Sequence, residues 1–208
     1  MYAIHTTPGF IVSSRPSGEA GKLLSIFTKD LGLIRATAQG IRFEKSKLRP
    51  FIQDYSLGVF SFVSGKEFWR LTNAQELKVQ DTSLLAQTGD KLQEVKLADQ
   101  NQELIARIAL LLNRLLQGEE PHPELFIALD SLFDFINSWP TLGSEAFKTL
   151  ESLIVTRILH RLGYVASISA LKEDIESDAI SLDRLTLLGQ QRTLMNQHIN
   201  RALRESHL

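Results

Sequence analysis

The spacing of apolar residues changes from a strand-like to a helix-like pattern near residue 80. Before this point, short apolar and β-branched runs are separated by turns that contain glycine. Such runs are typical of β-strands, and two of them joined by a short glycine turn predict a hairpin. The expected strands are Gly9–Ser14, Leu23–Thr28, Leu33–Ala38, Phe51–Phe62 and Phe68–Ala74. About five short strands in about 75 residues favour a small closed barrel such as the OB-fold.

Beyond residue 80 the apolar residues recur at steps of three and four, which is typical of one buried face of a helix. The first such stripe holds Leu104, Ile105, Ile108, Leu111, Leu112, Leu115 and Leu116, and Gly118 ends it. Pro121 and Pro123 open a second helix, whose apolar positions are Phe126, Leu129, Leu132, Phe133 and Ile136.

Two further helices bring the second half to at least four. One is expected between a possible N-cap at Ser144 and Gly163, with Phe147, Leu150, Ile154 and Ile158 on its buried side. The last runs from about Asp183 to Arg204 and buries Leu187, Leu194, Met195, Ile199 and Leu203. The pattern predicts an α+β chain of two domains: a five-stranded OB-fold barrel over residues 1–80 and an α-helical bundle over residues 81–208.

The composition narrows the class of protein. Apolar residues make up 43% and charged residues 23% of the chain, which is typical of a folded globular protein. The chain has no cysteine, which excludes disulfides, thiol chemistry and a zinc–thiolate site. The first residues lack the pattern of a signal peptide, and the longest apolar runs, such as Ile108–Leu112, are too short to cross a bilayer. We therefore expect a soluble cytoplasmic protein without membrane contact.

The charge is distributed unevenly between the two halves. Residues 1–80 hold 11 Lys and Arg against 6 Asp and Glu, a balance of +5, and the remaining residues hold 12 against 18, a balance of −6. A basic half is a signal for nucleic-acid binding, although an ordinary solvated surface can also carry such a charge.

Catalytic motifs give no positive indication. The stretch Gly18–Leu23 departs from a phosphate-binding loop, because only two residues separate its glycines and a leucine follows the lysine. The five histidines are scattered without metal-ligand spacing, and no Gly-x-Ser-x-Gly elbow is present. The sequence thus predicts no catalytic residue, no metal and no cofactor.

A cluster of cations in the barrel half offers a different chemistry. Its members are Arg15, Lys22, Arg35, Arg42, Lys45, Lys47 and Arg49. Four of them lie in the loop from Arg42 to Arg49, which also contains Phe43, either a stacking ring or a buried hydrophobe. Cations that follow the phosphates beside an aromatic ring bind single strands on OB-type barrels without reading their sequence. We expect these seven residues to contact the DNA backbone.

Several segments also resemble a known family. The run GFIVSSRPSGEAGKLLSIFTKDLG, residues 9–32, closely resembles the opening of the DNA repair protein RecO family, as do Ala38–Arg42 and Lys45–Arg49. In the second half, Glu120–Phe126 is similar to the inter-helix turn of the family and Leu159–Tyr164 to the end of its central helix. The resemblance spans about residues 5–165 and is most specific in the first 50.

The resemblance implies a fold and a function. It implies an N-terminal OB-fold, a helical C-terminal domain and a nucleoid-associated bacterial protein. It also implies binding of single- and double-stranded DNA, annealing of complementary strands and assistance in loading RecA onto strands coated by single-stranded DNA-binding protein. The implied partners are RecR and the acidic C-terminal tail of the coating protein; Arg107, Arg114 and Arg157 are candidates for contact with that tail, or lone surface arginines.

One departure from the family affects the second half. Many members carry a four-cysteine zinc module soon after the Leu-Gly-Tyr segment, whereas residues 165–190 contain no cysteine here. We therefore expect a zinc-free variant. Two other classes of function stay open at this point: a peptide-binding adaptor with an incidental basic surface, and an enzyme with an unrecognised site.

Overall fold

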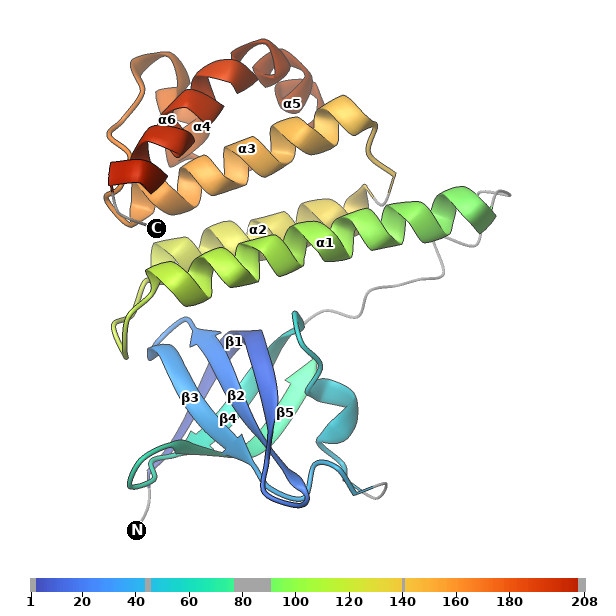
Figure 1. Ribbon diagram of the computed structural model, residues 1–208, viewed down its shortest axis with the longest axis vertical. Helices are drawn as coiled ribbons and strands as arrows, with labels where there is room; N and C mark the ends of the chain where they lie inside the picture. The colour runs from blue at the N-terminus through green and yellow to red at the C-terminus, as the bar shows by residue number, and fades with distance from the viewer. Residues whose placement is uncertain (1–2, 44–45, 77–90, 140, 206–208) are drawn as a thin grey trace. The chain divides into compact units, whose positions relative to one another are not determined.

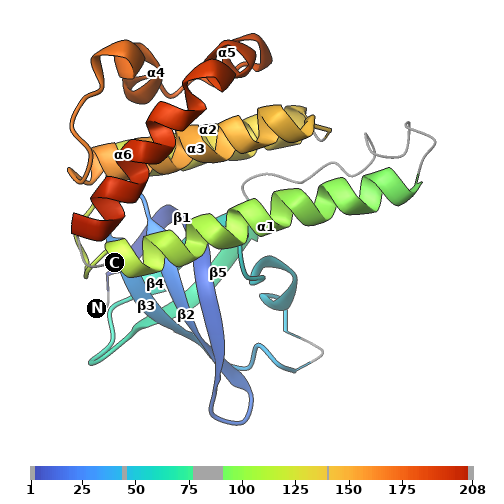
Figure 2. The same ribbon diagram turned by 45° about the horizontal axis from the view of Figure 1, so that its top comes forward.

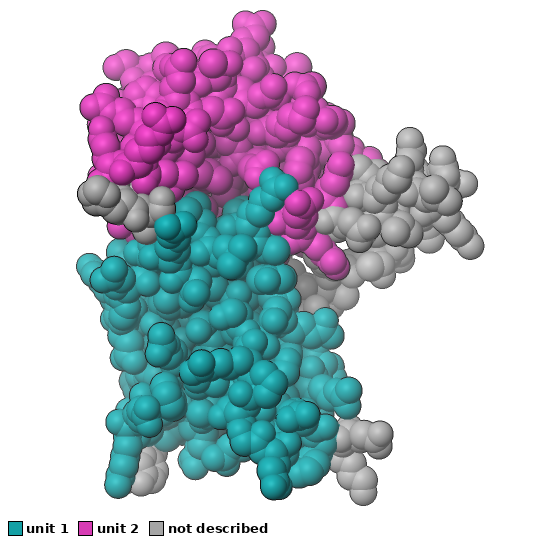
Figure 3. Space-filling model, in the orientation of Figure 1, with its two compact units in different colours: residues 1–80, 105–123 teal, residues 81–104, 124–208 magenta. Residues whose placement is uncertain are grey.

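The chain forms two compact units, which Figure 3 shows in different colours. Unit 1 comprises residues 1–80 and 105–123, and unit 2 comprises residues 81–104 and 124–208. The computed structural model describes the backbone of residues 3–43, 46–76, 91–139 and 141–205, and the side chains of these residues except 76 and 91–99. The division differs from the expected boundary after residue 80, because residues 105–123 group with the barrel.

Unit 1 is built on a five-stranded barrel, as the sequence predicts (Figure 1). The strands are β1 (Ile4–Ser17), β2 (Gly21–Thr28), β3 (Gly32–Ala38), β4 (Leu57–Val63) and β5 (Trp69–Glu76). They close in the order β1-β2-β3-β5-β4, with β3 and β5 parallel and the other neighbours antiparallel. This closed five-stranded barrel is the OB-fold that the sequence predicts. Helices follow it along the chain, as expected for the α+β class.

The alternation of side chains along the strands explains the core of the barrel. In β3, Ile34, Ala36 and Ala38 are buried, whereas Arg35 is exposed between them. Successive side chains of a strand point to opposite faces, so one face fills the barrel and the other carries polar groups. The remaining core residues include Ile11, Leu24, Ile26, Phe60, Phe62 and Leu71.

The segment before β4 differs from the prediction of a strand starting at Phe51. Residues Arg49–Phe51 form a short 3-10 helix, η1, and β4 begins only at Leu57. Pro50 lies inside η1, where its fixed φ and missing N–H suit a tight turn better than a strand ladder. Ile41 and Ile52 from this region join the core of the barrel, each about 3% exposed. The apolar residues of this loop therefore fill the barrel interior without forming a strand.

The end of helix α1 (Lys91–Leu115) and the turn after it belong to unit 1. The turn contains Gly118 at φ +74°, as expected for a residue that ends a helix, and its carbonyl accepts a hydrogen bond from the N–H of Leu33 at 3.2 Å. Gly32 has φ +72°, and a Cβ at this position would lie 2.3 Å from the carbonyl oxygen of Glu120. Glycine at position 32 therefore lets the turn of residues 118–120 approach the β2–β3 hairpin closely.

Unit 2 is helical, and α3 is central to it (Figure 2). Its elements include α2 (Pro123–Ser138), α3 (Ser144–Arg161), α4 (Lys172–Glu176), α5 (Leu182–Leu188) and α6 (Arg192–Glu205), with the 3-10 turns η3 (Ser169–Leu171) and η4 (Gly189–Gln191). Helix α3 packs against α4, α5 and α6. The predicted stripe of α2 is buried in full, and Gly163 follows α3 at φ +79°.

Two helix predictions need correction. The N-cap of α3 is Gly143, which has the extended backbone that a cap position requires, and Ser144 is the first helical residue. The helix expected from Asp183 to Arg204 is divided into α5 and α6 by η4, which begins at Gly189, a poor helix former. As a consequence Leu187 is 63% exposed, although the continuous pattern predicts that it is buried.

Candidate nucleic-acid interface

Three of the seven predicted DNA-contact residues converge on one groove at the end of the barrel. Lys22, Arg42 and Arg49 line this groove, which has a volume of about 550 Å³ and which we call the basic groove. Its other lining residues are Ile41, Pro50, Ile52 and Gln53. No carboxylate is among these lining residues, so three cations face the same space without a local countercharge in the described part of its wall.

The local structure explains how these cations meet. Lys22 lies at the start of β2 and pairs with the buried Ala38, so the two residues share one face of the sheet. Its Nζ donates a hydrogen bond to Ser14 Oγ at 3.3 Å. Arg42 follows β3, where its backbone N–H donates to the carbonyl of Ala20 and its Nη1 to the carbonyl of Glu19 at 3.2 Å. Arg49 begins η1. The loop that fills the barrel with Ile41 and Ile52 thus also carries Arg42 and Arg49 to Lys22.

A second group of cations lies on the outer face of the sheet. Arg15 pairs with Leu23 across β1 and β2, Leu23 pairs with Thr37, and Thr37 pairs with Arg70 on β5. Both arginines are exposed and stand at the two ends of this cross-strand row. Arg70 is not among the seven cations predicted from the sequence. The alternating pattern of β5 predicts that the side chain of Arg70 points outward. Its position beside β3 could not be predicted, because it depends on the order of the strands in the barrel.

The remaining loop residues are less constrained. Lys47 is exposed, and Lys45 lies outside the described residues. Phe43 is 64% exposed, so it is not the buried hydrophobe that the sequence left open. Because the ring is exposed beside Arg42, the prediction that it stacks on a base stays open.

Arg35 is separated from the basic groove and lines a different depression, which we call the polar groove. Its volume is about 620 Å³, and its floor is formed by Ser25, Leu33 and Arg35. The other lining residues are Glu67, Phe68, Asn113, Leu116, Gln117, Gly118 and Glu119. Two carboxylates therefore accompany the one arginine. The seven predicted residues do not form one continuous cation cluster.

Trp69 fixes one of these carboxylates. Its Nε1–H donates a hydrogen bond to Glu119 Oε1 at 2.7 Å. The indole ring is half-buried and meets the rings of His5 and Phe62 edge to face, with centroid separations of 5.3 Å and 6.4 Å. The side chain of Glu119 is thus anchored to the barrel through a ring that is itself packed.

The candidates for partner contact lie in different environments. Arg107 and Arg114 are exposed on the part of α1 that belongs to unit 1, seven positions apart and hence near one face of the helix. Leu110 lies between them and is 67% exposed. Sequence reasoning missed Leu110, because it stands beside the buried stripe of α1.

Arg157 is buried, so the expectation that it contacts a partner or lies on the surface is wrong. It is 1% exposed in α3, where Nε, Nη1 and Nη2 donate to the carbonyls of Asp174, Asp178 and Ala179 at 2.8, 3.3 and 3.0 Å. Burial lowers the pKa of its guanidinium to about 10, and the charge of Arg161 acts in the same direction. Because these donors are occupied inside the fold, Arg157 is a structural residue of unit 2.

Ion pairs continue this arrangement between the end of α3 and α5. Arg161 pairs with Asp178, and Arg184 pairs with Asp174 through Nε–Oδ1 and Nη2–Oδ2 contacts of 2.5 and 2.8 Å. The chain has no cysteine to bind zinc, so the residues present do not fit a thiolate metal centre. Among the described residues no group of three or more His, Asp or Glu side chains is placed to hold a metal. No described helix is long and apolar enough to span a membrane.

Comparison with known proteins finds sequences similar to this chain. Residues 1–79 match the family model described as "Recombination protein O N terminal". The chain is 33% identical over 129 residues to the DNA repair protein RecO of Synechococcus elongatus, which covers 62% of this chain and 44% of that protein. It is 28% identical over 149 residues to the protein of the same name from Pseudoalteromonas atlantica, covering 70% of this chain and 56% of the relative. A third relative, from Heliobacterium modesticaldum, is 26% identical over 166 residues, covering 80% of this chain and 54% of that protein. The matched segment thus spans about half the length of these relatives.

Proposed function

We propose that this chain, whose residues 1–79 match the N-terminal model of the RecO family, acts in DNA repair and recombination by binding DNA rather than by catalysing a reaction. In this proposal the barrel holds single- and double-stranded DNA, promotes annealing of complementary strands, and assists RecA loading on strands coated by single-stranded DNA-binding protein. The basic groove carries the proposal, since Lys22, Arg42 and Arg49 converge there and the described residues of its lining include no carboxylate.

The chemistry of annealing matches such a surface. Two strands repel each other through their phosphates, and cations that neutralise those phosphates lower this barrier without any reacting group. Base pairing then supplies the driving free energy. Within the proposal Arg15, Arg35, Lys45, Lys47 and Arg70 extend the phosphate contacts of the basic groove.

A salt titration tests the binding step. The variant K22E/R42E/R49E should lose affinity for a labelled single strand irrespective of its sequence, and the slope of log affinity against log salt should become shallower by about 2, from about 0.7 for each lost phosphate contact. The matched control is K172E/R201E/R204E, which makes the same charge change at exposed positions of unit 2. Equal losses in both variants would assign the binding to net charge alone, and no binding by the unmodified chain at low salt would overturn the proposal.

An annealing assay separates the proposed mediator from a peptide-binding adaptor. Two complementary labelled strands should anneal faster with the unmodified chain than without it, and the K22E/R42E/R49E variant should lose most of this acceleration. An adaptor whose basic surface is incidental gives no acceleration at any concentration.

The partner side of the proposal uses α1. We propose that the face formed by Arg107, Leu110 and Arg114 receives the acidic C-terminal tail of single-stranded DNA-binding protein, while RecR is the second expected partner. An exposed leucine between two arginines suits a segment that combines carboxylates with an apolar residue. A labelled acidic peptide with an apolar end should bind the unmodified chain and lose affinity for L110S and R114E, whereas L187S, which changes an exposed leucine of unit 2, should bind normally.

A further inference from the structure

We propose that the basic groove binds the terminal phosphate of a DNA strand, the phosphate monoester at a strand end, in preference to the phosphodiesters inside the strand. This inference rests on the proposed DNA binding and names the part of the strand that the groove recognises. The arrangement of the cations, the groups that hold them and the apolar part of the wall all favour such a ligand.

The cations of the groove come from separate segments of the chain. Lys22 lies at the start of β2, Arg42 follows β3, and Arg49 begins η1. All of them line the same groove of about 550 Å³. They are therefore gathered around one space and are not spread along a path.

The outer face of the barrel shows the opposite arrangement. Arg15 and Arg70 stand at the two ends of the cross-strand row that runs through Leu23 and Thr37. Three strand spacings of about 4.8 Å each separate the two arginines by roughly 14 Å along the sheet. Cations spaced in this way suit successive phosphodiesters, each of which carries one negative charge.

A terminal phosphate matches the basic groove better than an internal one. The second pKa of a phosphate monoester is about 6, so the group carries close to two negative charges at neutral pH. It also presents three oxygens that accept hydrogen bonds. The described lining of the groove offers three cations and no carboxylate to receive this charge.

Neutral acceptors hold two of the cations without reducing their charge. Lys22 Nζ donates to Ser14 Oγ at 3.3 Å, and Arg42 Nη1 donates to the carbonyl of Glu19 at 3.2 Å. A carboxylate in either place would neutralise the cation that it binds. Because a hydroxyl and a carbonyl take these places, the two side chains are positioned while their positive charge stays available to an anion.

Apolar side chains form much of the remaining wall. Ile41 and Ile52 are each about 3% exposed, and Pro50 lies between them in sequence, in η1. Opposite charges attract more strongly beside such a surface than in bulk water. A volume of about 550 Å³ lies within the usual range for small organic ligands, roughly 300 to 1,000 Å³, so the groove has room for a phosphate together with its sugar.

Strands of one sequence that differ only at their ends test the inference on the full chain. One strand has hydroxyl groups at both ends, a second carries a 5′-phosphate and a third a 3′-phosphate. Hydroxyl-ended strands that are one and two nucleotides longer bracket the added charge. We expect one or both phosphorylated strands to bind about three- to tenfold more tightly than every hydroxyl-ended strand at low salt, as one added charge-assisted contact gives. The preferred end gives the direction in which the strand enters the groove. Equal affinities of the phosphorylated and the charge-matched strands would overturn the inference.

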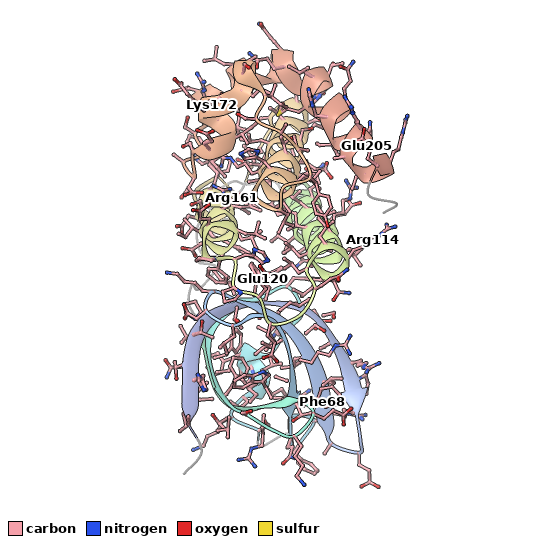
Figure 4. All side chains as sticks on the ribbon, turned by 90° about the vertical axis from the view of Figure 1, so that its left-hand side faces the viewer. Phe68, Arg114, Glu120, Arg161, Lys172 and Glu205 are labelled. Carbon is pink, nitrogen blue, oxygen red and sulfur yellow. The ribbon has the colours of Figure 1, made fainter. Side chains whose placement is uncertain are left out.

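Variants locate this preference in the basic groove. In K22Q/R42Q, the ratio of the affinity for the phosphorylated strand to that for the hydroxyl-ended strand should fall towards one. Arg15→Gln should weaken the binding of both strands by the same factor and keep the ratio, because Arg15 lies on the outer face. Lys172→Gln, at an exposed cation of unit 2 that is labelled in Figure 4, should change neither affinity. Retention of the ratio in K22Q/R42Q, or its loss in Arg15→Gln, would contradict the assignment to the groove.

A pH series on the unmodified chain decides the question without any variant. The ratio should increase as the pH rises from about 5 to about 7.5, because the terminal phosphate gains its second charge near pH 6. The described lining of the groove contains no histidine or carboxylate, and Glu19 contacts Arg42 through its backbone carbonyl. Other charges of the chain act on both strands alike, so they leave the ratio unchanged. A ratio that is independent of pH would overturn the inference.

The outcomes separate this inference from the proposed function. Salt-dependent binding of all strands without preference for a phosphorylated end refutes the terminal-phosphate site and leaves the proposed DNA binding standing. If no strand binds at low salt, the proposed function itself fails and the site with it.

Discussion

Arginine has opposite roles in the two units of this protein. In unit 1, Arg15, Arg42 and Arg49 are exposed on the barrel and its loops. In unit 2, Arg157 is 1% exposed and donates to three carbonyls of the segment that follows α3. The guanidinium offers five donors in a planar fork, so the same group can meet phosphates outside the protein or carbonyls inside it.

The difference shows what decides between these roles. In unit 1, apolar side chains fill the interior of the barrel. The arginines named above lie on its surface, where water solvates their charges until a ligand binds. In unit 2 the stretch of residues 166–184 forms only short helices, and its carbonyls need donors that the local backbone does not supply. Arg157 supplies three of them from a neighbouring helix, so its charge stabilises a segment that has little regular hydrogen bonding of its own.

Replacing Arg157 should therefore have the largest effect on stability. Arg157→Ala leaves the carbonyls of Asp174, Asp178 and Ala179 without these donors and opens a cavity in unit 2. We expect a loss of roughly 3 to 5 kcal/mol in the free energy of unfolding, from the cavity left by a large buried side chain and from about 1–3 kcal/mol for the buried carbonyl of Asp174; the other two hydrogen bonds are only part-buried, so water can replace their donors. Urea unfolding followed by helical circular dichroism measures it. Arg201→Ala, at a side chain that is 76% exposed, should change stability little; equal losses in the two variants would contradict the structural role of Arg157.

Asp174 should show a smaller effect of the same kind. Its carboxylate is buried and accepts two hydrogen bonds from Arg184, and this hydrogen bond raises the pKa of the Arg184 guanidinium above its usual value. Asp174→Asn keeps the shape and removes the charge, so we expect a loss of about 1 to 2 kcal/mol in the free energy of unfolding. Glu176→Gln makes the same kind of change at the exposed end of α4 and should be close to neutral in the same urea experiment.

The contrast between the units also marks what the sequence could predict. The alternation of Ile34, Ala36 and Ala38 predicts the inward face of β3 correctly, because burial on one face requires a period of two. Gly118 and Gly163 predict helix ends correctly, because both adopt a positive φ. The strand prediction failed at Phe51, where apolar residues fill the barrel from a loop.

The burial of Arg157 has a local signal in the sequence. Leu150, Ile154 and Ile158 form the buried stripe of α3, and position 157 lies three residues after 154 on the same side of the helix. The pattern therefore places this arginine on the buried face. Its carbonyl partners are 17 to 22 residues further along the chain, in a stretch without periodicity, and no local pattern could identify them.

The candidate site shows the same limit. The seven cations were grouped by closeness in sequence, but the barrel directs neighbouring residues to different faces. Lys22 and Arg42 meet at the barrel end, whereas Arg35 lies beside two carboxylates in the polar groove. Arg70, far from the others in sequence, joins the outer face because β5 pairs with β3.

Single substitutions on the barrel should affect binding and leave stability intact. Arg42→Ala should weaken single-strand binding about three- to tenfold at low salt, because one phosphate contact contributes on the order of 1 kcal/mol. Its thermal unfolding should stay close to that of the unmodified chain, since the residue is exposed. Arg35→Ala should weaken binding less than Arg42→Ala, because Glu67 and Glu119 already offset its charge. The reverse order of the two affinities would move the phosphate path from the basic groove to the polar groove.

The smallest effect is expected at Glu145, an exposed ion pair of unit 2. Hydrogen bonds from Lys148 and Arg192, at 2.9 and 2.7 Å, lower the pKa of the Glu145 carboxyl below its usual value. Because the folded state holds the carboxylate more tightly than the unfolded chain does, the stabilisation is present above the ordinary pKa of Glu and is lost as the pH falls through the lowered value. Glu145→Gln should therefore lower the melting temperature slightly at neutral pH and have no effect once the pH is well below about 4. A difference from the unmodified chain that grows on acidification would contradict this sign, and a large one at neutral pH would show that an exposed pair can match the contribution of the buried Arg157 network.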